Sequence, residues 1–239
     1  MKLIIEENEL AMSESAMSII LGAMMQDKQV NISLTSGRSP IEMYKMMVPK
    51  VKDKPQFENI QYWLFDEAPY DNQPHGINWN DMQDLFFRDA NIPDERIHIL
   101  SMDNWEHYDR EIEKAGGIDV MVIGLGHDGH FCANSPRTTI LDSYSYYVPW
   151  TKKCEMNPTY QPREHNPYSI TMGPKSLMKV KHLVIIVNGA HKAKILKEVL
   201  DSPITNELPA TILKLHPNCT LIADKDAAAL LNIEDYKRL

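Results

Sequence analysis

The feature that most constrains the fold is a short apolar run that ends in glycine and is followed at once by titratable side chains. Residues 118–123, IDVMVI, are mostly apolar, which predicts a strand buried on both faces of a parallel sheet. Gly124 ends the run, and Asp128 and His130 follow shortly after it. Open α/β sheets bind ligands beyond the carboxyl ends of their strands. We therefore expect a proton-transfer pair in this loop, because a carboxylate can orient and tune an imidazole.

The same loop also satisfies the G-x-G-x-x-G pattern of dinucleotide-binding proteins, through Gly124, Gly126 and Gly129. In those proteins the pattern opens a helix. Here it leads into residues 134–136, NSP, and proline disfavours a helical conformation in the residue before it. We therefore favour a catalytic loop over a nucleotide site.

Strand-like and helix-like segments alternate along the chain, which predicts an α/β fold with a mostly parallel central sheet and helices on both faces, similar to a Rossmann fold. The length suits a single domain over residues 1–239. Residues 143–166 have little periodicity; we expect them to cross the active-site mouth, and an ordinary surface loop is the alternative. The expected strands are 2–6, 30–34, 60–65, 97–100, 118–123, 183–187 and 220–223, with weaker candidates at 146–148 and 169–172, and the expected helices are 10–25, 41–48, 80–89, 105–114, 192–200 and 210–215.

Composition narrows the function classes. A net charge of -8 argues against nucleic acid as a partner but allows an anionic metabolite in a locally basic pocket. The three cysteines lack C-x-x-C spacing and the nine histidines form no metal-ligand pattern, so we expect no disulfide framework and no metal. There is no apolar run of membrane-spanning length and no signal-like N-terminus. We therefore expect a cytoplasmic protein with no membrane contact.

Two strand ends carry residues suited to a phosphate group. The strand at 30–34 is followed by a Ser/Gly loop and then a helix, whose free N–H groups favour a phosphate; a simple serine cap before a helix is the alternative. Lys192 follows the strand at 183–187 and starts the next helix, where a cation opposes the helix dipole unless an anion lies near. Together they predict a phosphate site formed by Ser36, Gly37, Arg38, Ser39 and Lys192.

Two adjacent carboxylates, Asp66 and Glu67, follow the strand at 60–65. Burying both is costly unless each has a partner. For Glu67 a helix cap or turn is the better interpretation, whereas Asp66 directly continues a buried strand and is expected to have a functional role.

These residues lie in five longer motifs: TSGRSP, LFDEAPY, GLGHDGHFCANSP, SITMGPKSLMKVKHLVIIVNGAHKAKIL and LPATILKLHPN. With them the chain resembles, nearly from end to end, the glucosamine/galactosamine-6-phosphate isomerase family. This family holds glucosamine-6-phosphate deaminases and 6-phosphogluconolactonases. The SITMG and LPATILKLHPN segments are more similar to the deaminase branch.

The resemblance implies a sugar-6-phosphate substrate and chemistry without a metal or an organic cofactor. It implies that Asp66 moves a proton between C2 and C1, and that Asp128 and His130 help to open the sugar ring. The loop at residues 36–39 and Lys192 would hold the phosphate. Three further residues could contact the substrate: Glu67, Gly126 and Ser135.

The chain departs from the deaminase pattern at three places. One is Arg38, which replaces a small residue and could add a bidentate phosphate contact or point to solvent. Deaminases carry N-E-P where this chain has residues 134–136, NSP, so a carboxylate that would serve ring opening is missing. Ala68 follows Asp66 and Glu67 where deaminases usually have tyrosine and lactonases arginine. We expect an amino-sugar-phosphate deaminase or a related isomerase. The alternatives are a 6-phosphogluconolactonase and a non-catalytic sugar-phosphate sensor, although a sensor needs no proton relay. Assembly into a homo-oligomer stays open.

Overall fold

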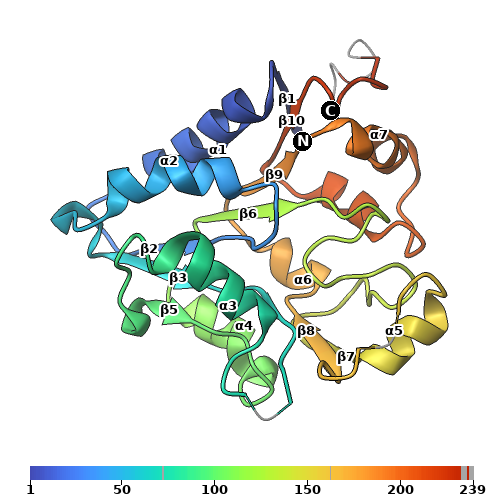
Figure 1. Cartoon of the computed structure of the whole chain (residues 1–239), viewed down its shortest axis with the longest axis horizontal. Coiled ribbons are helices and arrows are strands. Elements are labelled where there is room, and N and C mark those ends of the chain that lie inside the picture. Colours follow the sequence, from blue (N-terminus) through green and yellow to red (C-terminus); the bar gives the residue numbers. More distant parts are fainter. Residues whose placement is uncertain (72, 162, 233–235, 237–239) are drawn as a thin grey trace.

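A seven-stranded sheet forms the centre of the computed structural model, which describes residues 1–71, 73–161, 163–232 and 236. Its strand order is β1-β10-β9-β6-β2-β3-β5 (Figure 1), and every pairing in it is parallel. The predicted parallel α/β fold is thus confirmed. The strands are β1 (Lys2–Glu6), β2 (Val30–Ser33), β3 (Ile60–Trp63), β5 (Ile97–His98), β6 (Val120–Gly124), β9 (Leu183–Val187) and β10 (Cys219–Asp224).

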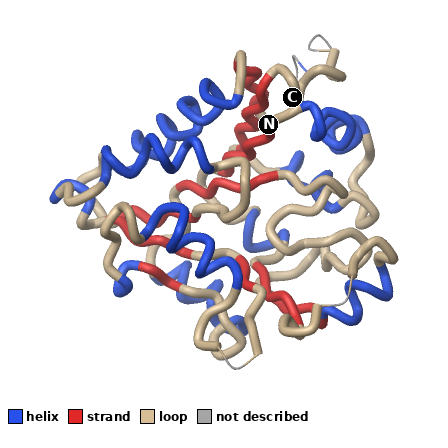
Figure 2. Tube along the Cα trace, in the orientation of Figure 1, coloured by secondary structure: helices blue, strands red, loops and turns tan. Residues whose placement is uncertain are grey.

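Helices cover both faces of this sheet, as Figure 2 shows. On one face lie α1 (Glu9–Met24), α2 (Ile41–Val51) and α3 (Ile77–Met82), the last continued by a π-helical segment, Gln83–Phe87. On the other face lie α4 (Trp105–Lys114), α6 (Pro174–Leu177) and α7 (Ala193–Asp201). In the described residues, none of these helices has the length and apolar character needed to span a bilayer.

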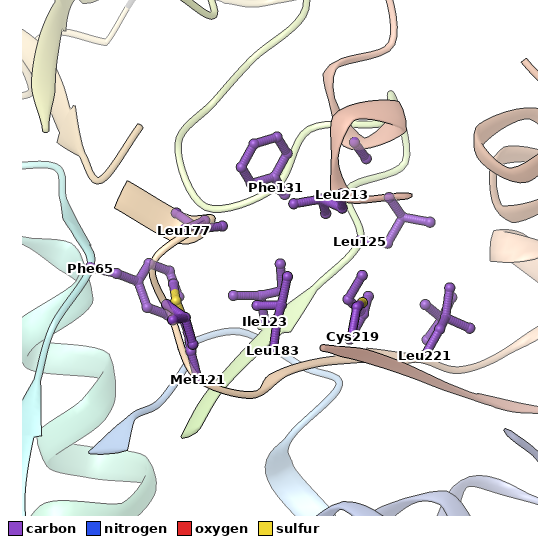
Figure 3. Packing of buried hydrophobic residues seen from close by; sticks show 14 of the residues in the cluster. Phe65, Met121, Ile123, Leu125, Phe131, Leu177, Leu183, Leu213, Cys219 and Leu221 are labelled. Atoms are coloured by element: carbon purple, nitrogen blue, oxygen red, sulfur yellow. The ribbon is translucent and has the colours of Figure 1, made fainter. Parts of the chain in front are cut away.

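Each face of the sheet has its own apolar core, and the central strands contribute to both. Along β6, Met121 and Ile123 pack into one core while Val120 and Val122 pack into the other. Figure 3 shows the first core, with Met121 and Ile123 beside Leu183 of β9. Full burial of one such side chain stabilises the fold by about 1.5–3 kcal/mol. This explains why the strand sequences are continuously apolar and do not alternate.

A second, antiparallel sheet corrects the predicted arrangement. Its order is β4-β8-β7, formed by β4 (Asp66–Glu67), β8 (Tyr168–Thr171) and β7 (Tyr146–Pro149). The two weaker strand candidates are therefore strands, but outside the central sheet. Asp66 likewise lies in this small sheet, whereas we expected it to continue the buried strand.

Two further segments differ from the prediction. The stretch 143–166, expected to lack periodicity, holds β7 and a helix, α5 (Trp150–Met156), which packs beside β7 and β8. Residues 210–215 lie in a 3-10 helix, Pro209–Leu215, and Lys192 ends a 3-10 turn, Ala190–Lys192, directly before α7. Short 3-10 helices also occur at Pro55–Phe57 and Asp94–Arg96.

The topology brings four strand ends together at the centre of the sheet. β2 pairs with β3 on one side and with β6 on the other, and β6 pairs with β9. The chain order reverses between β2 and β6, and such a switch point leaves a crevice at the carboxyl edge of a parallel sheet. The loops that follow these four strands carry the residues predicted for the site.

Tyr108 of α4 provides a test of how the ends of β3 and β5 are held together. Its buried hydroxyl donates hydrogen bonds to the carbonyl oxygens of Leu64 at 2.7 Å and His98 at 3.0 Å, at the ends of β3 and β5. Tyr108→Phe should lower the free energy of unfolding by about 1–3 kcal/mol, because the buried Leu64 carbonyl loses its donor, whereas the His98 carbonyl keeps its bond of 2.9 Å from the Leu64 N–H. Urea denaturation measures this. The matched change Tyr147→Phe, at a side chain 42% exposed, should alter stability far less. Equal effects of the two changes would contradict the assignment.

Candidate active site

A cavity of about 990 Å³ opens at the carboxyl ends of β2, β3, β6 and β9. Of the residues predicted for the site, only Asp128 does not line it, and Asp128 is bonded to the lining residue His130. The structure therefore brings the predicted residues to one place. In the described part of the chain, no group of three or more His, Cys, Asp or Glu side chains is arranged to hold a metal ion.

Asp66 lies in the wall of the cavity with a shifted pKa. The Asn78 amide donates a hydrogen bond of 2.7 Å to its carboxylate. Burial and the adjacent Glu67 raise the pKa of Asp66 to about 7, although the Lys153 ammonium and the Asn78 amide favour the ionised form. A carboxyl group that titrates near neutral pH can both take up and release a proton in the cavity.

Glu67 has a different function from its neighbour. Its carboxylate accepts hydrogen bonds from the backbone N–H groups of Ala68 at 2.8 Å, Asn78 at 2.8 Å and Trp79 at 3.0 Å. Two of these groups lie in the first turn of α3, which has unpaired N–H groups. Glu67 therefore caps α3 and, through it, positions Asn78 beside Asp66. This agrees with the cap interpretation, while the substrate contact considered for Glu67 has no support beyond its place in the lining.

Asp128, His130 and Tyr160 form a hydrogen-bonded chain. Asp128 Oδ1 lies 2.6 Å from His130 Nδ1, and the Tyr160 hydroxyl donates to Asp128 Oδ2 at 2.6 Å. Burial alone would raise the pKa of Asp128, but the bonds and charge of His130 and the bond from Tyr160 outweigh it and hold that pKa well below its usual range. An ionised carboxylate only accepts, so Nδ1 carries a proton and the neutral imidazole keeps a lone pair on Nε2.

Gly126 makes room for this imidazole. A Cβ atom at Gly126 would overlap the ring of His130. The loop is closed by a hydrogen bond of 2.8 Å from the Gly126 N–H to the His130 carbonyl. Gly126 therefore acts by leaving space, and no helix follows in the described residues 125–145, which agrees with rejecting a dinucleotide site.

The predicted phosphate residues lie in the loops that follow β2 and β9, and they also line the cavity. Lys192 Nζ donates to the Leu125 carbonyl at 2.7 Å, and burial lowers the pKa of Lys192 against the opposing effect of Asp128. Gly37 has a positive φ of 95°, which lets the backbone of the loop turn before α2. The cap position of α2 is Pro40, with no side-chain cap bond, so the alternative of a serine cap is wrong. The loop is completed by Ser36, Arg38 and Ser39, which also line the cavity.

Sequence reasoning missed a lysine. Lys153 of α5 is 2% exposed, and its ammonium donates to the Ala133 carbonyl at 2.8 Å and to the Ser135 hydroxyl at 3.0 Å. Burial lowers the pKa of Lys153 to about 8, although Asp66 opposes this shift. The only sequence signal was a Lys-Lys pair in an aperiodic segment, and such a pair usually lies in solvent.

An aromatic wall was missed as well. Trp150 stacks on Tyr160 with ring centroids 5.7 Å apart, and the Arg163 guanidinium lies 3.9 Å from the Trp150 ring centroid. All three line the cavity. The predicted crossing of the active-site mouth by residues 143–166 thus corresponds to a wall built from a helix and stacked rings.

The sheet and cavity define a class: an α/β protein with titratable groups at the switch point of a parallel sheet. Residues 6–222 match the family described as glucosamine-6-phosphate isomerases/6-phosphogluconolactonase. The chain belongs to this family.

Relatives and solved structures agree with this assignment. A glucosamine-6-phosphate deaminase of Thermoanaerobacter pseudethanolicus is 34% identical over 251 residues, covering 100% of this chain and 98% of that protein. One of Clostridium botulinum is 32% identical over 250 residues, covering 99% of each. A structure titled as a monomeric glucosamine-6-phosphate deaminase superposes with a TM-score of 0.79 at 22% identity, covering 97% of this chain and 100% of that one. The 6-phosphogluconolactonase from Trypanosoma cruzi gives 0.74 at 17% identity, covering 97% of each chain, and shows the shared fold.

The raised pKa of Asp66 predicts a pH-dependent stability difference. The pKa of Asp66 is 3.8 in the unfolded chain and about 7 in the folded protein, so the folded state favours the protonated carboxyl. Asp66 therefore destabilises the fold increasingly as the pH rises from 3.8 to about 7. Asp66→Asn should therefore increase the free energy of unfolding at pH 8, and the gain should shrink as pH falls towards 4. Urea denaturation across this range measures it. The exposed change Asp71→Asn is the control, and a gain that does not vary with pH would refute the shift.

Proposed function

We propose that this protein deaminates an amino-sugar 6-phosphate, such as glucosamine-6-phosphate, through an aldose–ketose isomerisation that releases ammonia. One observation carries the proposal: Asp66 and His130 line the same cavity as the Ser/Gly loop at 36–39 and Lys192. Proton-transfer groups and candidate phosphate-binding residues thus share one ligand-sized space. The full-length relatives named as glucosamine-6-phosphate deaminases support this choice of reaction.

We assign the proton transfers of ring opening to His130. Asp128 fixes the imidazole through Nδ1, which leaves the Nε2 lone pair to take the proton of the sugar's C1 hydroxyl. The same nitrogen then returns a proton to the ring oxygen as the C1–O bond to the ring breaks. Tyr160 keeps Asp128 ionised and in place during both transfers.

We assign the proton transfer of the isomerisation to Asp66. In the open-chain sugar its carboxylate takes the proton from C2 and delivers it to C1. One proton of the amino group passes to the C1 oxygen, which leaves a hydroxyl at C1 and an imine at C2. Water then adds to the imine carbon and ammonia leaves, giving a ketose 6-phosphate. A base with a pKa of about 7 suits this exchange near neutral pH.

The phosphate is bound by Lys192 and by the loop at 36–39. Lys192 supplies a positive charge, and the loop at 36–39 supplies hydroxyl and backbone N–H donors at the start of α2. Because a charged sugar phosphate does not cross a bilayer unaided, we place the protein in the cytoplasm with its substrate. We propose that residues 1–239 act as one domain.

A specific observation keeps lactone hydrolysis as a second candidate. Position 135 carries serine where deaminases carry glutamate, and the neighbouring charge is the Lys153 ammonium. Hydrolysis of 6-phosphogluconolactone needs a base to activate water but moves no C2 proton. The same cavity could bind that substrate through its phosphate.

Ammonia release from glucosamine-6-phosphate tests the proposal. The parent protein should release ammonia, and Asp66→Asn should lower the rate by about 10²–10⁴-fold with substrate binding nearly unchanged, because an amide cannot take up the C2 proton. Asp71→Asn serves as the control. Hydrolysis of 6-phosphogluconolactone without ammonia release would favour the lactonase, and binding without turnover of either compound would favour a sensor.

Lys192 can be tested against a lysine of the helix that follows it. Lys192→Ala should weaken binding of phosphorylated sugars by about 10- to 100-fold, because a charge-assisted contact is lost. Lys194→Ala removes the same charge from a side chain 86% exposed on α7 and should have little effect. Isothermal titration with the sugar phosphate compares them. Equal affinities of the Lys192 variant and the parent would show that Lys192 does not bind the phosphate.

A further inference from the structure

Lys153 is buried without a carboxylate partner. Lysine is almost never fully buried unless it is paired. In the described part of the chain no ion pair involves Lys153, and its ammonium donates to two neutral acceptors, the Ala133 carbonyl and the Ser135 hydroxyl. An ammonium has three N–H donors, and Lys153 lines the cavity. A donor on a positive charge is thus available at the cavity wall.

Three charged side chains affect the pKa of the Lys153 ammonium. Asp66 on β4 and Asp128 in the loop after β6 attract its proton, while Arg163 repels it. The cation therefore lies close enough to Asp66 to stabilise the carboxylate form of that residue. Because position 135 carries serine, the ammonium meets a hydroxyl and is not neutralised by a carboxylate there.

An unpartnered hydroxyl lies on the same side of the cavity. Ser169 Oγ is buried and has no hydrogen-bond partner among the described residues, and Ser169 lines the cavity. Ser169 lies two positions before Thr171, which pairs with Asp66, so its side chain leaves the small sheet on the same face as Asp66. A buried hydroxyl without a partner is unfavourable, and an oxygen of a ligand would relieve this.

The proposed isomerisation creates a negative charge at this place. When Asp66 takes the C2 proton, the electron pair of the C2–H bond forms the C1=C2 bond, and the C1=O π pair moves onto the oxygen. No oxidant or other co-reactant takes part. Positioned donors that face such a developing charge lower the barrier in a site that excludes water.

We infer that Lys153 is a catalytic residue whose ammonium donates a hydrogen bond to the sugar's C1 oxygen as that oxygen becomes negative, with the Ser169 hydroxyl as a second donor. This inference rests on the proposed function. Lys153 keeps its proton throughout and Asp66 holds the C2 proton, so the two residues act as a pair of opposite charge across C1 and C2. A lysine that merely ties α5 to the loop at 133–135 would affect stability alone.

The test compares two phosphorylated ligands on matched variants. A five-carbon sugar hydroxamate 5-phosphate mimics the planar anionic intermediate, whereas a hexitol 6-phosphate carries the same phosphate without that charge. Lys153→Met should weaken hydroxamate binding by about 10- to 100-fold and leave hexitol phosphate binding within about two-fold. Its kcat should fall with little change in KM. Lys152→Met removes an exposed charge from the same helix and should change neither.

A second variant covers a failure of Lys153→Met to fold. Lys153→Gln retains a donor for the Ala133 carbonyl but lacks the charge, so it should show the same selective loss of hydroxamate binding. Equal hydroxamate affinities of either folded variant and the parent would overturn the inference, even in an enzyme that releases ammonia. A selective loss in a protein that releases no ammonia would uphold Lys153 as the oxyanion donor and reject the proposed substrate.

Discussion

Burial of β6 and β9 on both faces is the constraint on which the site depends. Alternate residues of each strand enter two different cores, so no polar side chain can be accommodated along their length. Titratable groups can therefore appear only where the strands end, and in a parallel sheet those ends share one edge. The pairing of β2 with β6 places the phosphate loop and the Asp128–His130 loop side by side, although they are far apart in the sequence.

Two carboxylates in one site acquire opposite properties from their surroundings. Asp128 accepts bonds from an imidazole and a phenol, which keep it ionised, so it serves to orient His130. Asp66 is part-buried next to a second carboxylate, which brings its pKa near neutrality although the Asn78 amide favours the ionised form. The protein thus separates orientation from proton transfer by local environment, as general acid–base sites require.

The parts of the fold that depend on local pattern were predictable from the sequence, and those that depend on distant pairing were not. Continuous apolar runs predicted β6 and β9, and the residues after them were correctly expected at one edge. The place of Asp66 in a separate sheet depends on pairing with Thr171, more than a hundred residues away, which no local pattern reveals. Lys153 was missed for the same reason, because its burial is created by the loop at 133–135 and by β7 and β8.

The small sheet carries the wall of the cavity, whereas the central sheet carries the loops with the phosphate residues and His130. The chain leaves the small sheet at β7, builds α5 and the Trp150–Tyr160 stack, and returns at β8 to the neighbouring position. This excursion begins and ends on paired antiparallel strands, so its length and sequence can vary without shifting the register of the parallel strands. The part of the wall outside Lys153 and Tyr160 can therefore differ between relatives without disturbing the central sheet. Divergence of substrate preference among relatives is then expected to concentrate in this excursion outside Lys153 and Tyr160, while β6 fixes the loop of Asp128 and His130, and pairing with β8 fixes Asp66.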